Sequence, residues 1–157
     1  MTAPPHIEQH HGDIDALVAR LYSAFRTRGG VEPALHILRE VLLPDALIVK
    51  AVSDDPDIFD VTRFIDTRRA ILTGGALVDF DEYEIDARTV RVGHVAHRWS
   101  LYRKTGTLDG VPFDTLGTKS LQCVDTAGGW RIASLAWDET RAGLSLPADW
   151  PWQAPCT

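Results

Sequence analysis

The residue in this chain best suited to acid–base chemistry is a histidine in an apolar, alternating segment. His97 lies in the run VAHRWSL, residues 95–101. Strand alternation would place Trp99 and Leu101 on the same face as His97, and that face is apolar. We therefore predict that His97 looks into a cavity, where a neutral imidazole could act as a general base near pH 7. The alternative is a core histidine that hydrogen-bonds to the backbone or to Tyr22.

Two kinds of side chain could assist His97. Tyr22, on the first expected helix, could donate a hydrogen bond to a ligand. The acidic segment 79–86 could supply a carboxylate that reaches the cavity and orients His97. The alternative is that most of these carboxylates form a solvated strand edge that discourages aggregation.

Two cations interrupt otherwise apolar patterns. Lys50 alternates with Ile48, and Arg68 interrupts the helical stripe that contains Phe64. A buried cation needs a partner. Either cation could bind a carboxylate ligand, or could instead pair with an acidic residue or extend its head to solvent.

Aromatic residues on the expected strands could wall an apolar cavity, or could equally belong to the core or to a dimer interface. The candidate ligand-binding residues are Lys50, Phe64, Arg68, Trp99 and Trp137.

No motif indicates a metal or another cofactor. Cys123 and Cys156 lack metal-type spacing, and His94 would lie on the opposite strand face from His97. Lys119 is followed by serine, but the glycine spacing of a phosphate-binding loop is missing. We therefore predict a protein without metal or cofactor.

Length and charge restrict the class of protein. A chain of 157 residues suggests one domain, and a formal net charge of −6 argues against nucleic acid as a partner. No apolar stretch approaches the roughly 20 residues of a membrane span. The N-terminal residues lack a basic region followed by an apolar run, so we expect no signal peptide and a cytoplasmic location.

Apolar periodicity predicts three helices and five strands. The first helix follows Asp13 and ends at Gly29-Gly30, the second starts near Pro33, and Asp57 or Asp60 caps the third. The expected strands span 46–52, 77–91, 94–105, 112–125 and 129–139. We expect a flexible lead-in over residues 1–12, one domain over 13–143, and a Trp- and Pro-containing tail over 144–157 that folds back onto the body or a partner subunit.

This order of elements favours an α+β fold. Strands this long must curve, and three amphipathic helices must cover one face of the resulting antiparallel sheet. A curved sheet closed by helices makes a cone, and we expect an apolar cavity at its wide end.

The chain resembles the nuclear transport factor 2-like (NTF2-like) superfamily, which has a cystatin-like cone fold, and is most similar to its SnoaL-like members. The resemblance rests on the first helical stripe running into Arg28-Gly29-Gly30, on Pro44-Asp45-Ala46, and on the last strand from Gly128 to Ile132. That superfamily contains isomerases, dehydratases, cyclases, hydrolases and non-catalytic binding proteins, so the resemblance implies a fold and no single chemistry.

Ketosteroid isomerases of this superfamily carry a helix tyrosine seven residues before a glycine, and Tyr22 precedes Gly29 by that spacing. Their catalytic base falls near Lys50 and their second oxyanion donor near Thr118, so two of three functional positions do not match. The resemblance therefore does not imply ketosteroid isomerisation.

Three functions remain open. The first is binding of a small apolar or aromatic molecule in the cone. The second is a metal-independent lyase, isomerase or hydrolase that uses His97 as acid/base and Tyr22 as hydrogen-bond donor. The third is a non-catalytic dimerisation subunit. We expect a homodimer in all three, because a sheet with helices on one face leaves the other face in need of cover.

Overall fold

The computed structural model describes residues 11–146. Its helices are α1 (Gly12–Ser23), α2 (Val31–Val41) and α3 (Val61–Thr73). Its strands are β1 (Leu42–Lys50), β2 (Asp57–Phe59), β3 (Leu77–Val92), β4 (Val95–Leu108), β5 (Val111–Thr126) and β6 (Gly129–Glu139). The three helices and four long C-terminal strands match the elements predicted from periodicity; their ends shift by a few residues, and the end of α1 shifts by more.

The start of α3 follows from its capping residue. The Asp60 carboxylate accepts a hydrogen bond from the backbone N–H of Arg63 at 2.7 Å, which satisfies one of the free donors of the first helical turn. The buried face of α3 includes Phe64 and Ile65. Capping and the apolar stripe together fix which face of α3 meets the sheet.

Helix α1 ends earlier than expected, at Ser23 rather than at Gly29-Gly30. The chain after α1 pairs with β3 instead: the Thr27 N–H donates to the Phe80 carbonyl at 3.1 Å, and the Phe80 N–H donates to Thr27 Oγ1 at 3.0 Å. Gly30, at φ 95°, then leads into α2. These bonds to β3 replace the helical bonds that a longer α1 would make.

The strands form one sheet in the order β2-β1-β6-β5-β4-β3. All neighbours are antiparallel except β1 and β6, which are parallel. Strand β2 was not among the predicted strands, and its first residue, Asp57, was considered as a helix cap; the strand pairs with the outer edge of β1. Strand β1 starts four residues earlier than predicted and contains Pro44; its register shifts between Leu42 and Leu47, because proline has no N–H for the ladder.

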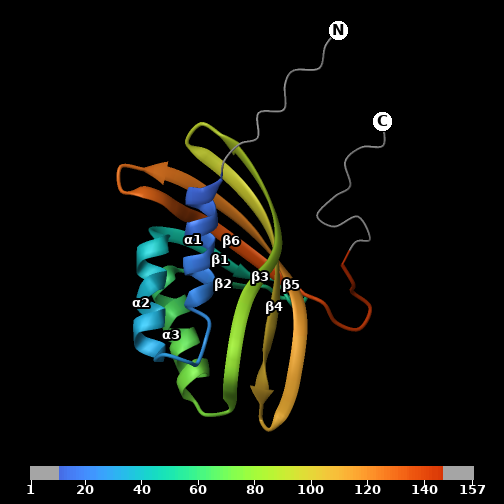
Figure 1. Cartoon of the computed structure of the whole chain (residues 1–157). Helices are drawn as coiled ribbons and strands as arrows, with labels where there is room; N and C mark the ends of the chain where they lie inside the picture. Colours follow the sequence, from blue (N-terminus) through green and yellow to red (C-terminus); the bar gives the residue numbers. More distant parts are fainter. Residues whose placement is uncertain (1–10, 147–157) are drawn as a thin grey trace.

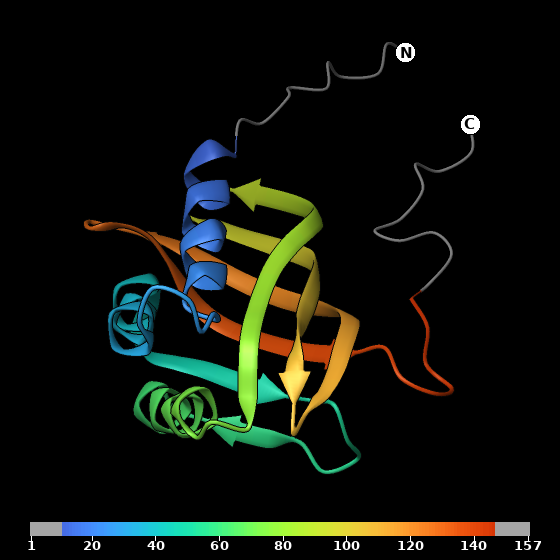
Figure 2. The ribbon, with the colours of Figure 1, turned by 60° about the horizontal axis from the view of Figure 1, so that its bottom comes forward.

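The sheet curves, and the helices lie on one side of it (Figure 1). Register shifts in β3 lie between Val78 and Asp81 and between Glu84 and Asp86, and such bulges bend a strand. Seen after rotation, β3, β4 and β5 arch over the space beside α3 (Figure 2). The structure confirms the predicted α+β class, with a cone-shaped, mostly antiparallel sheet covered on one face by three helices.

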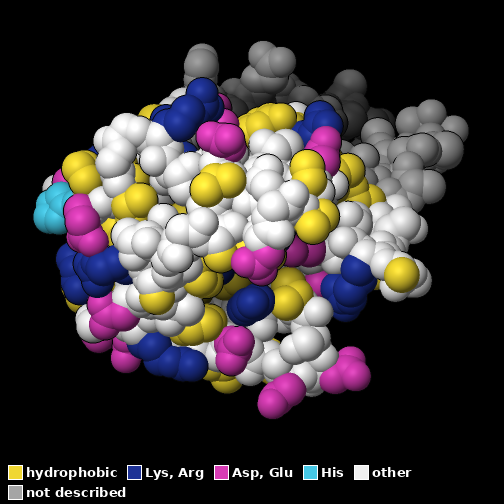
Figure 3. Space-filling view, turned by 90° about the horizontal axis from the view of Figure 1, so that it is seen from below, with side chains coloured by type: hydrophobic (Ala, Val, Ile, Leu, Met, Phe, Trp, Pro, Cys, Tyr) yellow, Lys and Arg dark blue, Asp and Glu magenta, His cyan; other side chains and the backbone are white. Residues whose placement is uncertain are grey.

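Within residues 11–146, no helix is both long enough and apolar enough to cross a membrane. The face seen from below intersperses hydrophobic side chains with charged side chains of both signs (Figure 3).

Candidate ligand pocket

A pocket lies on the helix-covered side of the sheet, against α3. It is lined by Phe25, Phe64, Arg68, Phe80, Glu82, Lys104, Lys119, Leu135, Trp137 and Glu139. The cavity volume is about 30 Å³, which is room for one or two water-sized groups. Five of these ten side chains are charged. The pocket is thus smaller and far more polar than the apolar cavity expected from the sequence.

Aromatic rings form one wall of this pocket. The ring of Phe64, on α3, lies edge-on to Phe25 at 6.1 Å between centroids and to Trp137 at 5.9 Å. Phe59, on β2, braces the same ring at 5.8 Å. Edge-to-face contacts of this kind fix the ring positions, so Phe64 and Trp137 form a preorganised wall.

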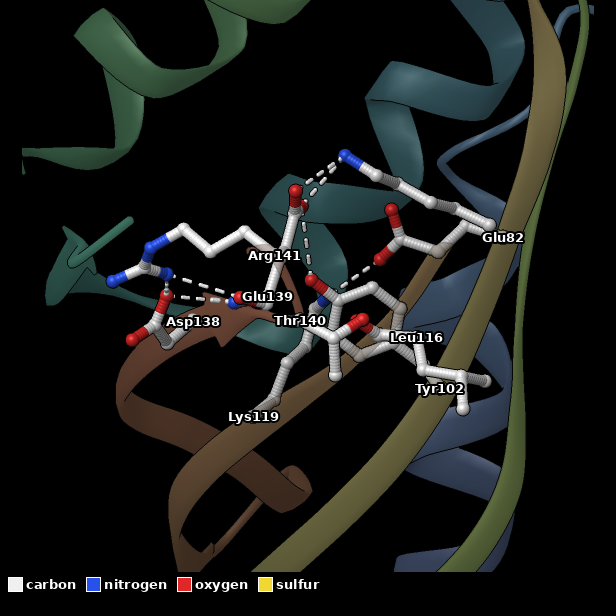
Figure 4. Close-up of polar contacts among 9 residues, drawn as sticks. Glu82, Tyr102, Leu116, Lys119, Asp138, Glu139, Thr140 and Arg141 are labelled. Carbon is white, nitrogen blue, oxygen red and sulfur yellow. Dashed lines mark hydrogen bonds and ion pairs between the residues drawn. The ribbon is translucent and has the colours of Figure 1, made fainter. Parts of the chain in front are cut away.

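Two ion pairs form the opposite, charged part of the pocket. Lys119 Nζ contacts Glu82, and Lys104 Nζ donates to both carboxylate oxygens of Glu139 at 2.7 Å. The Tyr102 hydroxyl also donates to Glu139, at 3.2 Å. Figure 4 shows that Glu82, Lys119, Tyr102 and Glu139 project from the strands toward one another. Each carboxylate of the pocket therefore already has a lysine partner.

The Glu82–Lys119 pair is almost fully enclosed, with 8% and 3% of the two residues exposed. Lys119 Nζ lies 3.4 Å from the centre of the Tyr102 ring, a cation–π contact. Burial lowers the pKa of Lys119, and the neighbouring Glu82 carboxylate opposes that shift. Burial also raises the pKa of Tyr102, with Glu82 and Glu139 adding to the effect, so its hydroxyl keeps its proton near neutral pH.

Arg68 differs from the two lysines. Its guanidinium carbon lies 5.2 Å from the centre of the Phe64 ring, 5.3 Å from that of Trp137 and 5.9 Å from that of Phe25. Its Nε is buried and has no hydrogen-bond partner among residues 11–146. Burial lowers the pKa of Arg68, and the carboxylates of Glu82 and Glu139 oppose that shift.

Tyr22 belongs to a separate buried network. Its hydroxyl lies 2.7 Å from Ser100 Oγ, and Ser100 in turn donates to Glu84. Arg98 joins the network through Glu84 and through Asp15 on α1. Tyr22 does not line the pocket of Arg68, and its hydroxyl is engaged with Ser100. Burial raises the pKa of Tyr22, although the bond to Ser100 lowers it.

The predicted orientation of His97 is wrong. On β4 the buried residues Arg98 and Ser100 face α1, so strand alternation turns His97 and Trp99 to the other face of the sheet. There His97 Nε2 lies 3.0 Å from Ser120 Oγ, and its ring stands edge-on to Trp99 at 5.7 Å. Burial lowers the pKa of this half-buried imidazole. The prediction was wrong because it assumed that the more apolar face of β4 points inward, whereas the inward face carries the polar residues Arg98 and Ser100.

The other predicted ligand-binding residues divide into two groups. Phe64, Arg68 and Trp137 line the pocket, although ligand binding by them stays a prediction. Lys50 ends β1, in register with Trp137 of β6, but it does not line the pocket. Trp99, on the other face of the sheet, also lies outside it.

Four charged pocket residues were not proposed as site residues from the sequence: Glu82, Lys104, Lys119 and Glu139. Strand alternation could have predicted two of them. Lys119 lies two residues from buried Leu121, and Glu139 lies two residues from buried Trp137, so each shares a strand face with a buried residue. One of the two interpretations of segment 79–86 was that a carboxylate reaches the cavity and orients His97; Glu82 does line the pocket, but its partner is Lys119.

Across residues 11–146, no cluster of three or more His, Cys, Asp or Glu residues is placed to hold a metal ion. The expected tail contacts of residues 147–157 and most of the lead-in lie outside the described residues.

The fold and the pocket can be compared with known proteins. No family model and no curated protein sequence matches this chain. Solved structures do match. An NTF2-like protein of unknown function from Prochlorococcus marinus is 15% identical with a TM-score of 0.65, and the match covers 85% of this chain and 94% of that one.

Two further neighbours carry different descriptions. A candidate calcium/calmodulin-dependent protein kinase II association domain from Xanthomonas campestris is 14% identical with a TM-score of 0.65, covering 88% of this chain and 93% of that one. A candidate ketosteroid isomerase from Shewanella frigidimarina is 17% identical with a TM-score of 0.55, covering 80% and 91%. This chain therefore has the NTF2-like, cystatin-like fold, and at these identities the likeness assigns no activity.

Proposed function

We propose that this NTF2-like domain binds a small organic molecule, with a polar head among the charged pocket side chains and an aromatic or apolar body against Phe64 and Trp137. The observation that carries the proposal is that an aromatic wall and five charged side chains converge on one open space inside the cone. Pockets that combine apolar walls with a few oriented polar groups are typical small-molecule sites.

The cavity volume limits how such a ligand enters. About 30 Å³ admits only a small head group. The body of the ligand must then lie nearer the pocket mouth, along the aromatic wall.

Geometry gives less support to an enzyme built on His97. His97 and the helix tyrosine Tyr22 lie on opposite faces of the sheet, so they cannot act on one substrate in the cone. Both carboxylates of the pocket are held by lysines, which favours binding over proton abstraction.

We also propose that the domain forms a homodimer through the uncovered face of the sheet. Val90, Val92 and Val95 lie exposed near the β3–β4 turn, and the register places Val90 opposite His97. Together with Trp99 they give apolar character to the face that no helix within residues 11–146 covers. Contiguous apolar surface of this kind marks association sites.

Ligand-observed and indole-resonance NMR test the binding proposal with a set of small aromatic compounds that carry neutral, anionic or cationic heads. We expect at least one compound to shift the indole resonance of Trp137 in a saturable way. Trp99, on the opposite face, is the internal control and should not respond. Shifts confined to Trp99, or no saturable shift with any compound, would contradict the proposal.

A further inference from the structure

The charges that line the pocket do not balance. Arg68, Lys104 and Lys119 are cations, whereas Glu82 and Glu139 are the only lining carboxylates among the described residues. Glu82 pairs with Lys119, and Glu139 pairs with Lys104. One positive charge is left, and it belongs to Arg68.

The contacts of Arg68 leave its hydrogen-bonding capacity unused. Faces of three aromatic rings surround its guanidinium, and such contacts attract the charge but accept no N–H donor in the plane of the group. Within the part of the chain that the structure describes, the buried Nε–H therefore has no acceptor. A buried donor without a partner is costly, and more so when it is charged.

Neighbouring arginines on α3 show that this arrangement is particular to Arg68. Arg69 binds Glu32 and Asp66 at the surface. Arg63 donates to the Ile58 carbonyl and lies over the Phe59 ring. Both have acceptors within the chain, whereas Arg68 lines the pocket and its Nε has no acceptor among the described residues.

We propose that the ligand of this pocket carries a carboxylate, and that Arg68 binds this carboxylate through the edge of its guanidinium that includes Nε. This inference rests on the proposed binding function and names the chemical class of the ligand. A guanidinium edge offers two parallel N–H donors, which match the two oxygens of a carboxylate.

Charge and space both favour a carboxylate over a phosphate. A single negative charge neutralises the one unmatched cation, whereas a dianion would add repulsion from Glu82 and Glu139. A planar carboxylate also fits beside the planar rings of Phe64 and Trp137, in a cavity of about 30 Å³. The ligand body then extends along the aromatic wall.

Three probes of nearly equal shape test the inference: benzoate, neutral benzamide and cationic benzylamine. Their binding is measured by titration calorimetry and by the Trp137 resonance at constant ionic strength. We expect benzoate to bind about tenfold or more tightly than benzamide, since a charge-assisted bidentate contact is worth at least that factor, and benzylamine to bind most weakly.

Two variants localise the effect. Arg68→Met should lower benzoate affinity by about tenfold or more and change benzamide affinity little. Arg69→Met removes the same charge from the same helix outside the pocket, and should leave both affinities within about twofold. Because Arg68→Met also removes an unpaired buried donor, the melting temperature of this variant should not fall below that of the wild type. A loss of benzoate affinity at an unchanged melting temperature then reports lost recognition and not lost folding.

The outcomes are distinguishable. Equal affinity for benzoate and benzamide, or benzoate binding that survives Arg68→Met, would overturn the carboxylate assignment and leave the binding function standing. If no aromatic probe with any head group affects Trp137, the proposed function fails and the assignment fails with it.

Discussion

At the scale of single residues, the interior of this cone contains charged side chains, although a charged group is more stable in water than in a protein interior. The Lys119 ammonium lies over the rings of Tyr22, Phe25 and Tyr102 and pairs with buried Glu82. Removing two charges from water is expensive, and their attraction offsets the cost only when both partners are present. The pair therefore keeps the sheet interior polar without adding much net stability.

Breaking this pair should be far more damaging than removing it. We expect Lys119→Met to lower the free energy of unfolding by about 3–5 kcal/mol, because it leaves the Glu82 carboxylate buried and unpaired. The double variant Lys119→Met/Glu82→Leu should recover most of that loss. Urea unfolding of the two single variants and the double variant measures the coupling.

An exposed ion pair gives the matched control. Arg103 and Asp114 pair across β4 and β5 at the surface, and Arg103→Met should cost less than about 1 kcal/mol. Strictly additive losses at positions 82 and 119 would show that the two side chains are not coupled.

At the scale of secondary-structure elements, periodicity predicted the three helices and the long strands because most of these elements have one clear apolar face. The stripe of α3 and the alternation of β5 and β6 are examples. The orientation of β4 could not be predicted in this way, since Arg98 and Ser100 face inward and Trp99 faces outward. These inward polar residues can be buried because they form hydrogen bonds and ion pairs with Asp15, Tyr22 and Glu84. Those partners belong to other elements, α1 and β3.

Strand β5 approaches β4 closely at a glycine. A methyl group at Gly117 would lie 2.4 Å from the ring and hydroxyl of Tyr102, which is buried and bonded to Glu139. We expect Gly117→Ala to cost about 1–3 kcal/mol through overpacking, measured by chemical denaturation. The cost should shrink in a Tyr102→Leu background, where the ring is absent.

Gly128 is the comparison position for this prediction. A methyl group there meets nothing nearer than 3.4 Å, so Gly128→Ala should change stability by less than about 0.5 kcal/mol. A similar loss from both alanine substitutions would mean that backbone freedom, not the Tyr102 ring, explains the need for Gly117.

At the scale of the whole molecule, the described residues 11–146 place helices on one face of the sheet and leave the other face bare (Figure 1). The covered face holds the pocket, and the bare face carries His97, Trp99 and the exposed valines. The two proposed activities of this domain, ligand binding and self-association, thus belong to opposite faces of a single sheet.

This division predicts that association can be disrupted without affecting the pocket. Val95 is 58% exposed on the bare face, and Val95→Asp should convert a dimer to a monomer because it places a charge in an apolar contact. Light scattering coupled to size-exclusion chromatography measures the mass. Val111→Asp is the control, since Val111 is 67% exposed at the opposite end of the sheet. A monomeric wild type, or a dimer unaffected by Val95→Asp, would contradict the proposed interface.

The sequence by itself determined the three helices, β1, the four long strands, their order and the α+β cone, because apolar periodicity and turn residues are local signals; it did not predict β2. It also singled out Arg68, Phe64 and Trp137, since each stands out within its own stripe or strand. Only the tertiary structure decided which face of β4 is inside, that Lys104 and Lys119 take both pocket carboxylates, and that Arg68 is left without an acceptor. The physical reason is that a charge can be buried only beside its partner, and these partners lie 35 and 37 residues apart in the chain.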